Sequence, residues 1–180
     1  MNRDHSPVQL VEPATERDHI RGSLDAPVVL VEYGDYECPH CGRAYWTIKR
    51  LREELGEQLA FVFRNFPVAE LHPRAESVAQ ALEAAAPQNR FWDMHDRFYE
   101  HQHELEGLDL NQHAQAVGLD VDRWKKDLQQ PEYRERVRQD IETGRQSGVT
   151  GTPTFFVNGT QYRGSYDFDS MLAALRHEVR

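Results

Sequence analysis

A short apolar run that leads directly into the only two cysteines of the chain restricts its fold more than any other feature. Residues 27–33 are almost wholly apolar and rich in β-branched side chains, which is typical of a central strand covered on both faces, and Gly34-Asp35 ends the run. The cysteines follow as Cys38-Pro39-His40-Cys41. From Pro39 to Gly56 apolar residues recur every three or four positions, which predicts an amphipathic helix whose first turn holds both cysteines.

The segments that follow predict a mixed sheet. Residues 59–63 form a second strand-like run, and a strand, a helix and a strand in that order indicate a right-handed crossover between parallel strands. Near the C-terminus, Asn158-Gly159 separates two further strand-like runs, which is the strongest short signal for a β-hairpin. A final helix over residues 168–179 would present an apolar face that covers the sheet.

Residues 68–148, between these two parts, contain no strand-like run. Helical segments follow one another there, at about residues 73–86, 88–103, 110–117, 121–129 and 132–146. A crossover between parallel strands needs only a dozen or so residues, so about 80 residues must form an inserted helical subdomain. The sequence therefore predicts an α/β fold in three parts. They are a partly disordered N-terminal arm over residues 1–23, a sheet domain made of residues 24–66 and 149–180, and an all-helical insertion over residues 67–148.

The length and charge of the chain exclude several classes of function. A domain of 180 residues can bury roughly 70% of the surface that its unfolded chain exposes, so it does not need a disulfide as a structural staple. The 30 acidic and 21 basic residues give a formal charge of −9, which argues against nucleic acid or an anionic membrane as the main partner. The apolar runs are far shorter than the ~20 residues that span a bilayer, so we expect no membrane insertion.

The first 21 residues bear on the location of the protein. They are polar, carry several charges, and lack the apolar stretch and the cleavage site of an export signal. We therefore expect a cytoplasmic protein, or a periplasmic or extracellular one if a leader has been removed.

The position of Cys38 at the start of a helix favours a reactive thiolate. Unpaired backbone N–H groups and the positive end of the helix dipole lower the pKa of a cysteine there from about 8.5 toward roughly 3.5 to 7.5. Cys41 lies one turn later, close enough for a disulfide, and Cys38 is expected to be the surface-exposed, attacking cysteine. Pro39 is tolerated in a first turn, and His40 adds a donor, and a charge when protonated, near the sulfur. Because a stabilised thiolate favours the reduced form, the disulfide would be an oxidant.

Zinc binding and an inactive remnant are the other interpretations of the cysteine pair. One Cys-x-x-Cys supplies only two of the four ligands of a closed zinc site, so two of the nine histidines would have to complete it. His101 and His103 on a helix would point about 200° apart, and neither His95 nor His113 lies at zinc-finger spacing after the cysteines. Apart from His40 in the motif and His72, which is expected to open a helix, the histidines, including His95 and His113, are expected at the surface. The sequence therefore favours redox chemistry and no metal.

Two motifs, in the right order, resemble those of the DsbA-like thiol-disulfide oxidoreductases of the thioredoxin superfamily. The first is Cys38-Pro39-His40-Cys41 after a strand, and the second is Gly-Thr-Pro-Thr-Phe-Phe-Val-Asn-Gly at residues 151–159, with the helical insertion between them. The similarity covers about residues 22–178. It implies a thioredoxin-like fold, in which a mixed central sheet is flanked by helices, and an enzyme that exchanges disulfides with protein substrates.

The resemblance implies a role for each matching residue around the cysteines. Cys38 would be the nucleophile that forms a mixed disulfide, Cys41 would resolve it, and Pro39-His40 would tune the potential. Pro153 would be a cis proline that faces the cysteines, and Thr152 would offer its backbone to an extended substrate by strand addition.

Glu32, six residues before Cys38, matches the buried acid of this family, which passes protons to and from the resolving thiol. Its position supports that role, because an acid within a buried strand is costly unless it has a partner or a function. The alternative is a residue at a sheet edge that reaches solvent.

The resemblance also implies partners. Protein thiols and disulfides would be the substrates, an unidentified redox protein would restore the active form, and the redox-active Cys38–Cys41 disulfide would serve without a further cofactor. We expect a monomer. In a reducing cytosol the same site would be drawn toward the dithiol and would act as a reductase or as the partner of a redox sensor. A redox-inactive or metal-binding interaction module is the alternative, and so is a glutathione-transferase-like enzyme, although those relatives typically lack the Cys-x-x-Cys pair.

Overall fold

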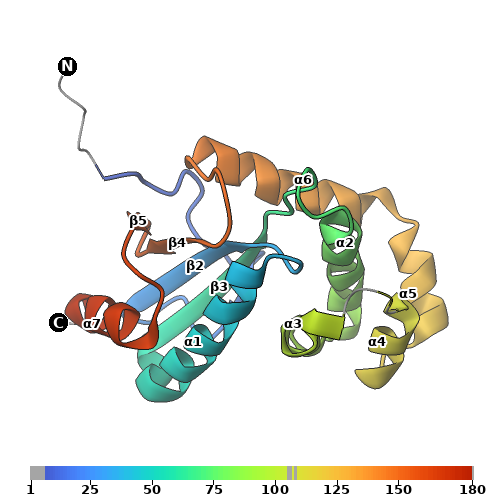
Figure 1. Cartoon of the computed structure of the whole chain (residues 1–180), viewed down its shortest axis with the longest axis horizontal. Coiled ribbons are helices and arrows are strands. Elements are labelled where there is room, and N and C mark those ends of the chain that lie inside the picture. Colours follow the sequence, from blue (N-terminus) through green and yellow to red (C-terminus); the bar gives the residue numbers. More distant parts are fainter. Residues whose placement is uncertain (1–6, 105–106, 108, 180) are drawn as a thin grey trace.

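The computed structural model describes residues 7–104, 107 and 109–179, and its centre is a five-stranded mixed sheet (Figure 1). The strands run in the order β1-β3-β2-β4-β5. The central strand β2 (Val28–Gly34) is parallel to β3 (Leu59–Asn65) and antiparallel to β4 (Thr154–Val157), while β1 (His19–Arg21) and β5 (Thr160–Tyr162) lie at the two edges. The predicted parallel pair and the C-terminal hairpin are both present.

The helices lie close to their predicted positions. They are α1 (Pro39–Leu55), α2 (Ala75–Ala85), α3 (Phe91–Glu100), α4 (Leu110–Ala116), α5 (Val121–Leu128), α6 (Pro131–Gln146) and α7 (Phe168–Glu178), with 3-10 turns at Gly56–Gln58, Ala86–Gln88 and Gln102–Glu104. Helices α2 to α6 form the insertion beside the sheet (Figure 1). The predicted α/β, thioredoxin-like fold with an all-helical insertion is confirmed.

The strand residues alternate between two hydrophobic clusters, as a period of two requires. Leu30, Phe61 and Phe63 face the cluster that contains α1, α7 and much of the insertion. Val31 and Val62 face the opposite cluster, which is closed by the N-terminal segment and α6. Both faces of β2 are therefore covered, which explains why its sequence is almost wholly apolar.

The N-terminal segment is more ordered than the sequence predicts. The sequence predicts an ordered domain only from about Leu24, but β1 pairs with β3, and Gln9 forms an isolated bridge with Thr160. The guanidinium of Arg64, on β3, pairs with the carboxylate of Asp18 at 2.9 Å. This contact joins the segment to a strand that lies far along the chain, so local periodicity gives no sign of it. Residues 1–6 of the predicted arm lie outside the described part of the chain.

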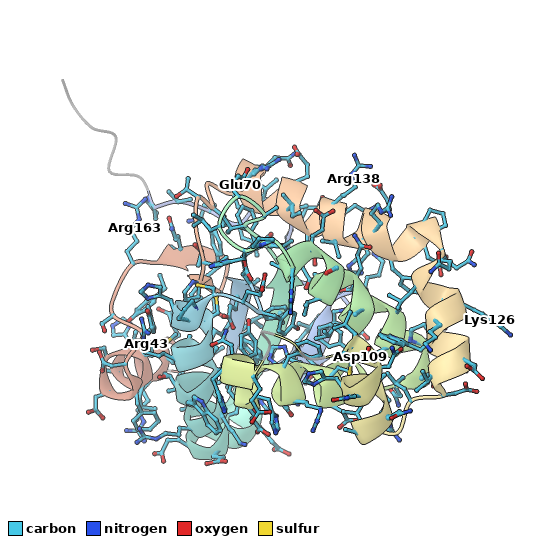
Figure 2. All side chains as sticks on the ribbon, turned by 45° about the vertical axis from the view of Figure 1, so that its right-hand side comes forward. Arg43, Glu70, Asp109, Lys126, Arg138 and Arg163 are labelled. Carbon is cyan, nitrogen blue, oxygen red and sulfur yellow. The ribbon has the colours of Figure 1, made fainter. Side chains whose placement is uncertain are left out.

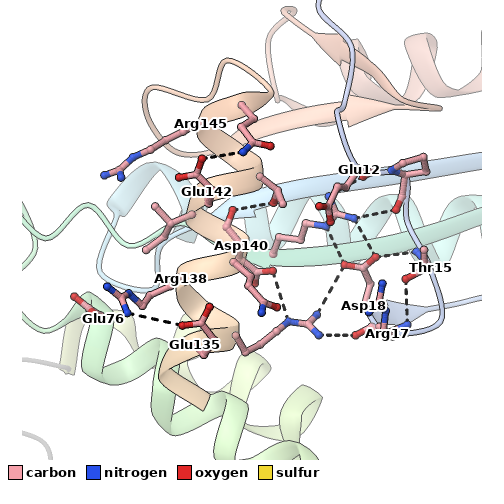
Figure 3. A pocket seen from close by; sticks show the side chains of 17 residues that line it. Glu12, Thr15, Arg17, Asp18, Glu76, Glu135, Arg138, Asp140, Glu142 and Arg145 are labelled. Carbon is pink, nitrogen blue, oxygen red and sulfur yellow. Dashed lines mark hydrogen bonds and ion pairs between the residues drawn. The ribbon is translucent and has the colours of Figure 1, made fainter. Parts of the chain in front are cut away.

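A polar cavity of about 880 Å³ surrounds this ion pair, between the N-terminal segment and α6 (Figure 3). Its charged side chains are largely paired with one another: Arg136 lies 3.9 Å from Asp18 and 3.6 Å from Asp140, and Arg138 lies 3.8 Å from Glu135. The cavity lies on the α6 face of the sheet and has neither cysteine in its lining.

Charged residues of both signs are exposed at the surface, among them Arg43, Asp109, Lys126 and Arg138 (Figure 2). No helix in the part of the chain that the structure describes is both long enough and apolar enough to span a bilayer.

Candidate active site

Both cysteines lie where the central strand β2 passes into α1. Cys38 is the N-cap of α1, with φ −74° and ψ 119°, and Pro39 is the first helical residue. Cys41 follows within the first turn, and both cysteines are free thiols in this structure. The strand therefore places the two sulfurs at the positive end of a 17-residue helix, as the sequence predicts.

The pKa of Cys38 is lowered to about 5. The largest cause is a hydrogen bond from the thiol of Cys41, and burial opposes it. Three further hydrogen bonds lower the pKa of Cys38 as well: one with Thr152, and one each with the backbone N–H groups of Cys41 and His40. The residue is only 5% exposed, so the prediction of a surface-exposed Cys38 is wrong, although the prediction of a low pKa agrees with the geometry.

Cys41 is fully buried, and its pKa moves in the opposite direction. Burial raises the pKa of the Cys41 thiol well above its ordinary value, and the neighbouring Cys38 and Glu32 raise it further. The backbone N–H of Asp35 donates to the sulfur of Cys41 at 3.5 Å. At neutral pH the outer cysteine is therefore a thiolate and the inner one keeps its proton.

Glu32 lies in the middle of β2 and is 2% exposed. It pairs with Phe63 on one side and Phe155 on the other, so the alternative of an edge residue is wrong. Its Oε1 has no hydrogen-bond partner. Burial, followed by the negative charge of Cys38, raises the pKa of the carboxyl to about 8. A carboxyl group that titrates near neutral pH therefore lies behind the two sulfurs.

A cavity of about 10 Å³ adjoins Glu32. Its walls carry side chains from β1, α1 and α3, including Arg21, Lys49 and His95. This volume is close to the minimum that holds one water molecule. The carboxyl of Glu32 thus lines the same small space as the polar side chains of Arg21 and Lys49.

The imidazole of His40 contacts two other side chains through its Nδ1. Its Nδ1 lies 2.6 Å from the guanidinium of Arg43 and 2.8 Å from the hydroxyl of Tyr166. An arginine can only donate, so Nδ1 is an acceptor and the hydroxyl of Tyr166 donates as well. The hydrogen bond from His40 that lowers the pKa of Cys38 comes from its backbone N–H.

Thr152 and Pro153 lie across from the cysteines. The Thr152–Pro153 peptide bond is cis, as the resemblance implies. The carbonyl oxygen of Thr152 lies 3.5 Å from the sulfur of Cys38. The fold thus brings together two motifs that are 114 residues apart in the sequence.

Beside the cysteines, Asp35 and His72 form a pair that was not predicted from the sequence. The buried carboxylate of Asp35 accepts hydrogen bonds from the backbone N–H groups of Glu37 at 2.8 Å and Val68 at 2.9 Å. It also lies 2.8 Å from Nδ1 of His72. The contact to Glu37 is an Asx-turn, so an aspartate directly after a strand was the available signal. The partner His72 has no comparable signal.

Two histidines expected at the surface are buried. His95 is 2% exposed, and its Nδ1 lies 2.9 Å from the hydroxyl of Tyr36. His113 is 1% exposed and stacks on Phe98. Aromatic rings enclose both imidazoles: the ring centroid of Phe63 lies 4.8 Å from that of His95, and the ring centroid of Phe98 lies 4.4 Å from that of His113. Among residues 7–104, 107 and 109–179, no three His, Cys, Asp or Glu side chains gather as a metal site would require.

Comparison with known families decides the membership of the chain. A family model described as Thioredoxin matches residues 14–177. The chain belongs to this thioredoxin family. The match covers both the Cys-x-x-Cys turn and the cis-proline loop, so the predicted place of this thioredoxin-family protein in the thioredoxin superfamily is confirmed.

The curated relatives of this thioredoxin-family chain are much longer proteins. It is 44% identical over 170 residues to "Na(+)/H(+) antiporter NhaA 1" of Mycobacterium sp. (strain KMS), a match that covers 93% of this chain and 27% of the relative. It is 43% identical over 165 residues to "Na(+)/H(+) antiporter NhaA" of Herminiimonas arsenicoxydans, with 92% and 26% covered. The chain thus spans about a quarter of the length of the curated relatives it matches.

Solved structures share the thioredoxin-like fold over nearly the whole chain. Oxidised BdbD from Bacillus subtilis is 23% identical, with a TM-score of 0.82 and coverage of 96% of this chain and 98% of that one. A thioredoxin-like oxidoreductase from Silicibacter pomeroyi is 24% identical, with a TM-score of 0.76 and coverage of 92% and 94%. Wolbachia pipientis alpha-DsbA1 is 17% identical, with a TM-score of 0.79 and coverage of 92% of both chains. At these identities the likeness establishes the fold alone.

Proposed function

We propose that this protein is a dithiol-disulfide oxidoreductase that exchanges disulfides with protein substrates. The observation that carries the proposal is the opposite displacement of two neighbouring thiol pKa values. The pKa of Cys38 falls to about 5, while that of Cys41 rises well above its ordinary value. A pair of this kind offers one stable thiolate as nucleophile or leaving group and keeps the second thiol in reserve.

The oxidising direction begins with the Cys38–Cys41 disulfide. A substrate thiolate attacks the sulfur of Cys38, which forms a mixed disulfide and releases Cys41 as a thiolate. A second substrate thiolate then attacks the first substrate sulfur and releases Cys38 as a thiolate. The substrate loses two electrons and gains a disulfide, and the protein gains the two electrons as a dithiol. In the reducing direction Cys38 attacks first and Cys41 resolves.

Glu32 is the group proposed to move the proton of Cys41. When Cys41 leaves as a thiolate, the protonated carboxyl of Glu32 supplies a proton, and in the reverse reaction the carboxylate removes one. A general acid or base is most effective when its pKa lies near the working pH, and the pKa of Glu32 is raised to about 8. The small cavity beside Glu32 supports exchange of this proton with the surface.

Substrate binding is assigned to the loop that carries Thr152 and Pro153. The carbonyl of Thr152 lies 3.5 Å from the attacking sulfur, so an extended peptide that pairs with this backbone would bring its own cysteine to Cys38. The protein thiol is the substrate, the Cys38–Cys41 pair is the redox group, and a second redox protein restores the starting form. We propose that a monomer carries out the reaction.

The direction in which electrons flow follows from the stability of the Cys38 thiolate. A lowered pKa stabilises the reduced form, so we propose that the disulfide is an oxidant, which suits a periplasmic or extracellular site. In a reducing cytosol the same pair would be held as a dithiol. The midpoint potential against glutathione tests this: a clearly less negative value than that of thioredoxin is expected, and a value as low as that of thioredoxin contradicts it.

Reduction of insulin by dithiothreitol tests the activity itself. The wild-type protein should accelerate precipitation of the insulin B chain, and Cys38→Ser should abolish the effect. Cys41→Ser is the matched variant, because it keeps the nucleophile and should accumulate mixed disulfides that denaturing gels without reductant detect. Equal activity of wild type and Cys38→Ser would overturn the proposal. Stoichiometric zinc on the purified protein, with an unreactive Cys38, would favour a metal-binding or redox-inactive module instead.

The curated relatives favour a second candidate, a redox module that works with a sodium/proton antiporter. The relatives carry that name, are 43% to 44% identical, and have about three-quarters of their length outside the match. The Cys41→Ser variant tests it, since a mixed disulfide with the antiporter should form in membranes that contain it. Trapping of other proteins alone would favour the general oxidoreductase.

A further inference from the structure

Gln102 joins the helical insertion to the turn that carries Cys38. It lies in the 3-10 turn Gln102–Glu104 that follows α3, 64 residues after the nucleophile. Its side-chain amide donates to the backbone carbonyl of Cys38 at 2.8 Å and to that of Tyr36 at 2.8 Å. One side chain from the insertion therefore bridges two carbonyls of the active-site turn.

Gly42, directly after Cys41, makes room for this contact. A Cβ atom at position 42 would lie 2.1 Å from Oε1 of Gln102 and 2.9 Å from its Cδ. Gly42 lies inside α1 and has an ordinary helical conformation there, so the turn does not require a glycine for its backbone angles. The close approach of Gln102 supplies the reason for a glycine inside a helix, where this residue is otherwise unfavourable.

We propose that Gln102 is a positioning residue that fixes Cys38 at the N-cap of α1 and thereby sets the reactivity of its sulfur. The inference rests on the proposed function, because it assigns Cys38 as the nucleophile. The carbonyl of Cys38 also accepts the N–H of Gly42 at 3.1 Å, so two donors hold the same peptide group. That peptide group fixes ψ of Cys38, and with it the direction of the sulfur relative to the backbone N–H groups of the first turn.

The helical insertion thus has a direct effect on the chemistry. Without the amide of Gln102, the turn from Tyr36 to Cys38 loses two hydrogen bonds, and the sulfur is no longer held over the N–H groups of His40 and Cys41. The thiolate of Cys38 then loses part of its stabilisation, and the disulfide becomes a weaker oxidant.

Gln102→Ala tests the inference, with His103→Ala as the matched control. His103 is the next residue in the same turn, and its side chain is 76% exposed. Titration of the reduced protein by the ultraviolet absorbance of its thiolate, and equilibration with glutathione, report on Cys38 without a protein substrate. In Gln102→Ala the pKa of Cys38 should rise by about one unit, and the equilibrium constant for oxidation of glutathione should fall about tenfold. His103→Ala should give wild-type values.

Gly42→Ala supplies an independent test of the same contact. The added methyl group must displace the end of Gln102, so this variant should shift the thiolate titration in the same direction. In the Gln102→Ala background there is no amide to displace, and Gly42→Ala should then have little further effect. Equal shifts in both backgrounds would overturn the inference.

The outcomes separate positioning from a purely structural role. A lower melting temperature of Gln102→Ala with an unchanged titration of Cys38 would mean that Gln102 only stabilises the fold, and would overturn the inference. Failure of the wild-type protein in the insulin assay, together with a shifted titration in Gln102→Ala, would overturn the proposed function and leave the positioning role standing.

Discussion

Nδ1 of His72 lies 2.8 Å from the buried carboxylate of Asp35. Asp35 follows β2, and His72 lies in the loop after β3. The contact therefore joins the loops that leave the carboxyl ends of two neighbouring parallel strands. The same carboxylate accepts the N–H of Val68 from the second loop. Because the backbone N–H of Asp35 donates to the sulfur of Cys41, the contact with His72 also fixes one donor to that sulfur.

Asp35→Ala should destabilise the reduced protein. The substitution removes the acceptor of three donors, two of them backbone N–H groups, and an unpaired buried donor costs about 1–3 kcal/mol. We expect a loss of roughly 2–4 kcal/mol in the free energy of unfolding, measured by urea denaturation of the reduced form. The exposed Asp25 gives the control, Asp25→Ala, which should stay within about 0.5 kcal/mol of the wild type. A similar small change for Asp35→Ala would contradict the structural role of the pair.

The stability of the reduced protein should depend on pH through both cysteines. The pKa of Cys38 is about 5 in the fold and near its ordinary value of 9.0 when unfolded. Its contribution to stability is therefore fully present above about pH 9 and is lost as the pH falls through about 5. Cys41 acts in the opposite sense, because its raised pKa favours the fold below about pH 9 and loses that contribution at higher pH.

Unfolding of the reduced protein over this range checks the pH dependence. The difference in the free energy of unfolding between the wild type and Cys38→Ser should increase from about pH 5 toward pH 9, because the variant has no thiolate to stabilise. The reaction rate of Cys38 with iodoacetamide should follow the same pKa, with its midpoint near 5. A midpoint near 9 would show that the N-cap position does not stabilise the thiolate.

The parts of the fold that local sequence controls could be predicted. The bounds of α1 follow from its apolar repeat and from Gly56, and the β4–β5 hairpin follows from Asn158-Gly159. Glu32 is an acidic residue within the otherwise apolar strand β2, whose sequence predicts burial on both faces. The burial of Glu32 could therefore be predicted.

The partners that tertiary structure supplies could not be predicted. The Nδ1 of His40 accepts from Tyr166, which is 126 residues away, and the order of the N-terminal segment depends on the contact between Arg64 and Asp18. Gln102 and Gly42 belong to different parts of the chain, and neither residue type signals the other. Such contacts arise only when segments that lie far apart in the sequence pack together, so periodicity within one segment carries no information about them.

Gly144→Ala should disturb the packing of α6 on the sheet. A Cβ atom there would lie 2.8 Å from the ring of Phe66 and 3.0 Å from that of Tyr33, and both rings are buried. Overpacking of this kind costs about 1–3 kcal/mol, which exceeds the gain of up to about 1 kcal/mol that alanine brings inside a helix. Thermal unfolding should show a lower midpoint. The control is Gly151→Ala, whose Cβ would meet nothing within 4 Å. A higher midpoint for Gly144→Ala would mean that the two rings can move aside.

Glu32→Gln should stabilise the protein and slow its chemistry. The pKa of Glu32 is raised to about 8 from 4.5, so the carboxyl favours the fold only below about pH 4.5, and the fold loses that contribution as the pH rises to about 8. Glutamine removes this penalty, so the variant should gain stability on the order of 5 kcal/mol near pH 8 and little near pH 4.5. Glutamine also removes the group that we propose as the proton carrier of Cys41, so disulfide exchange should slow most where Glu32 titrates. The exposed Glu57 gives the control, Glu57→Gln, which should change neither quantity. Exchange rates equal to those of the wild type between about pH 6 and pH 9 would remove the proton-transfer role from Glu32, whatever the stability shows.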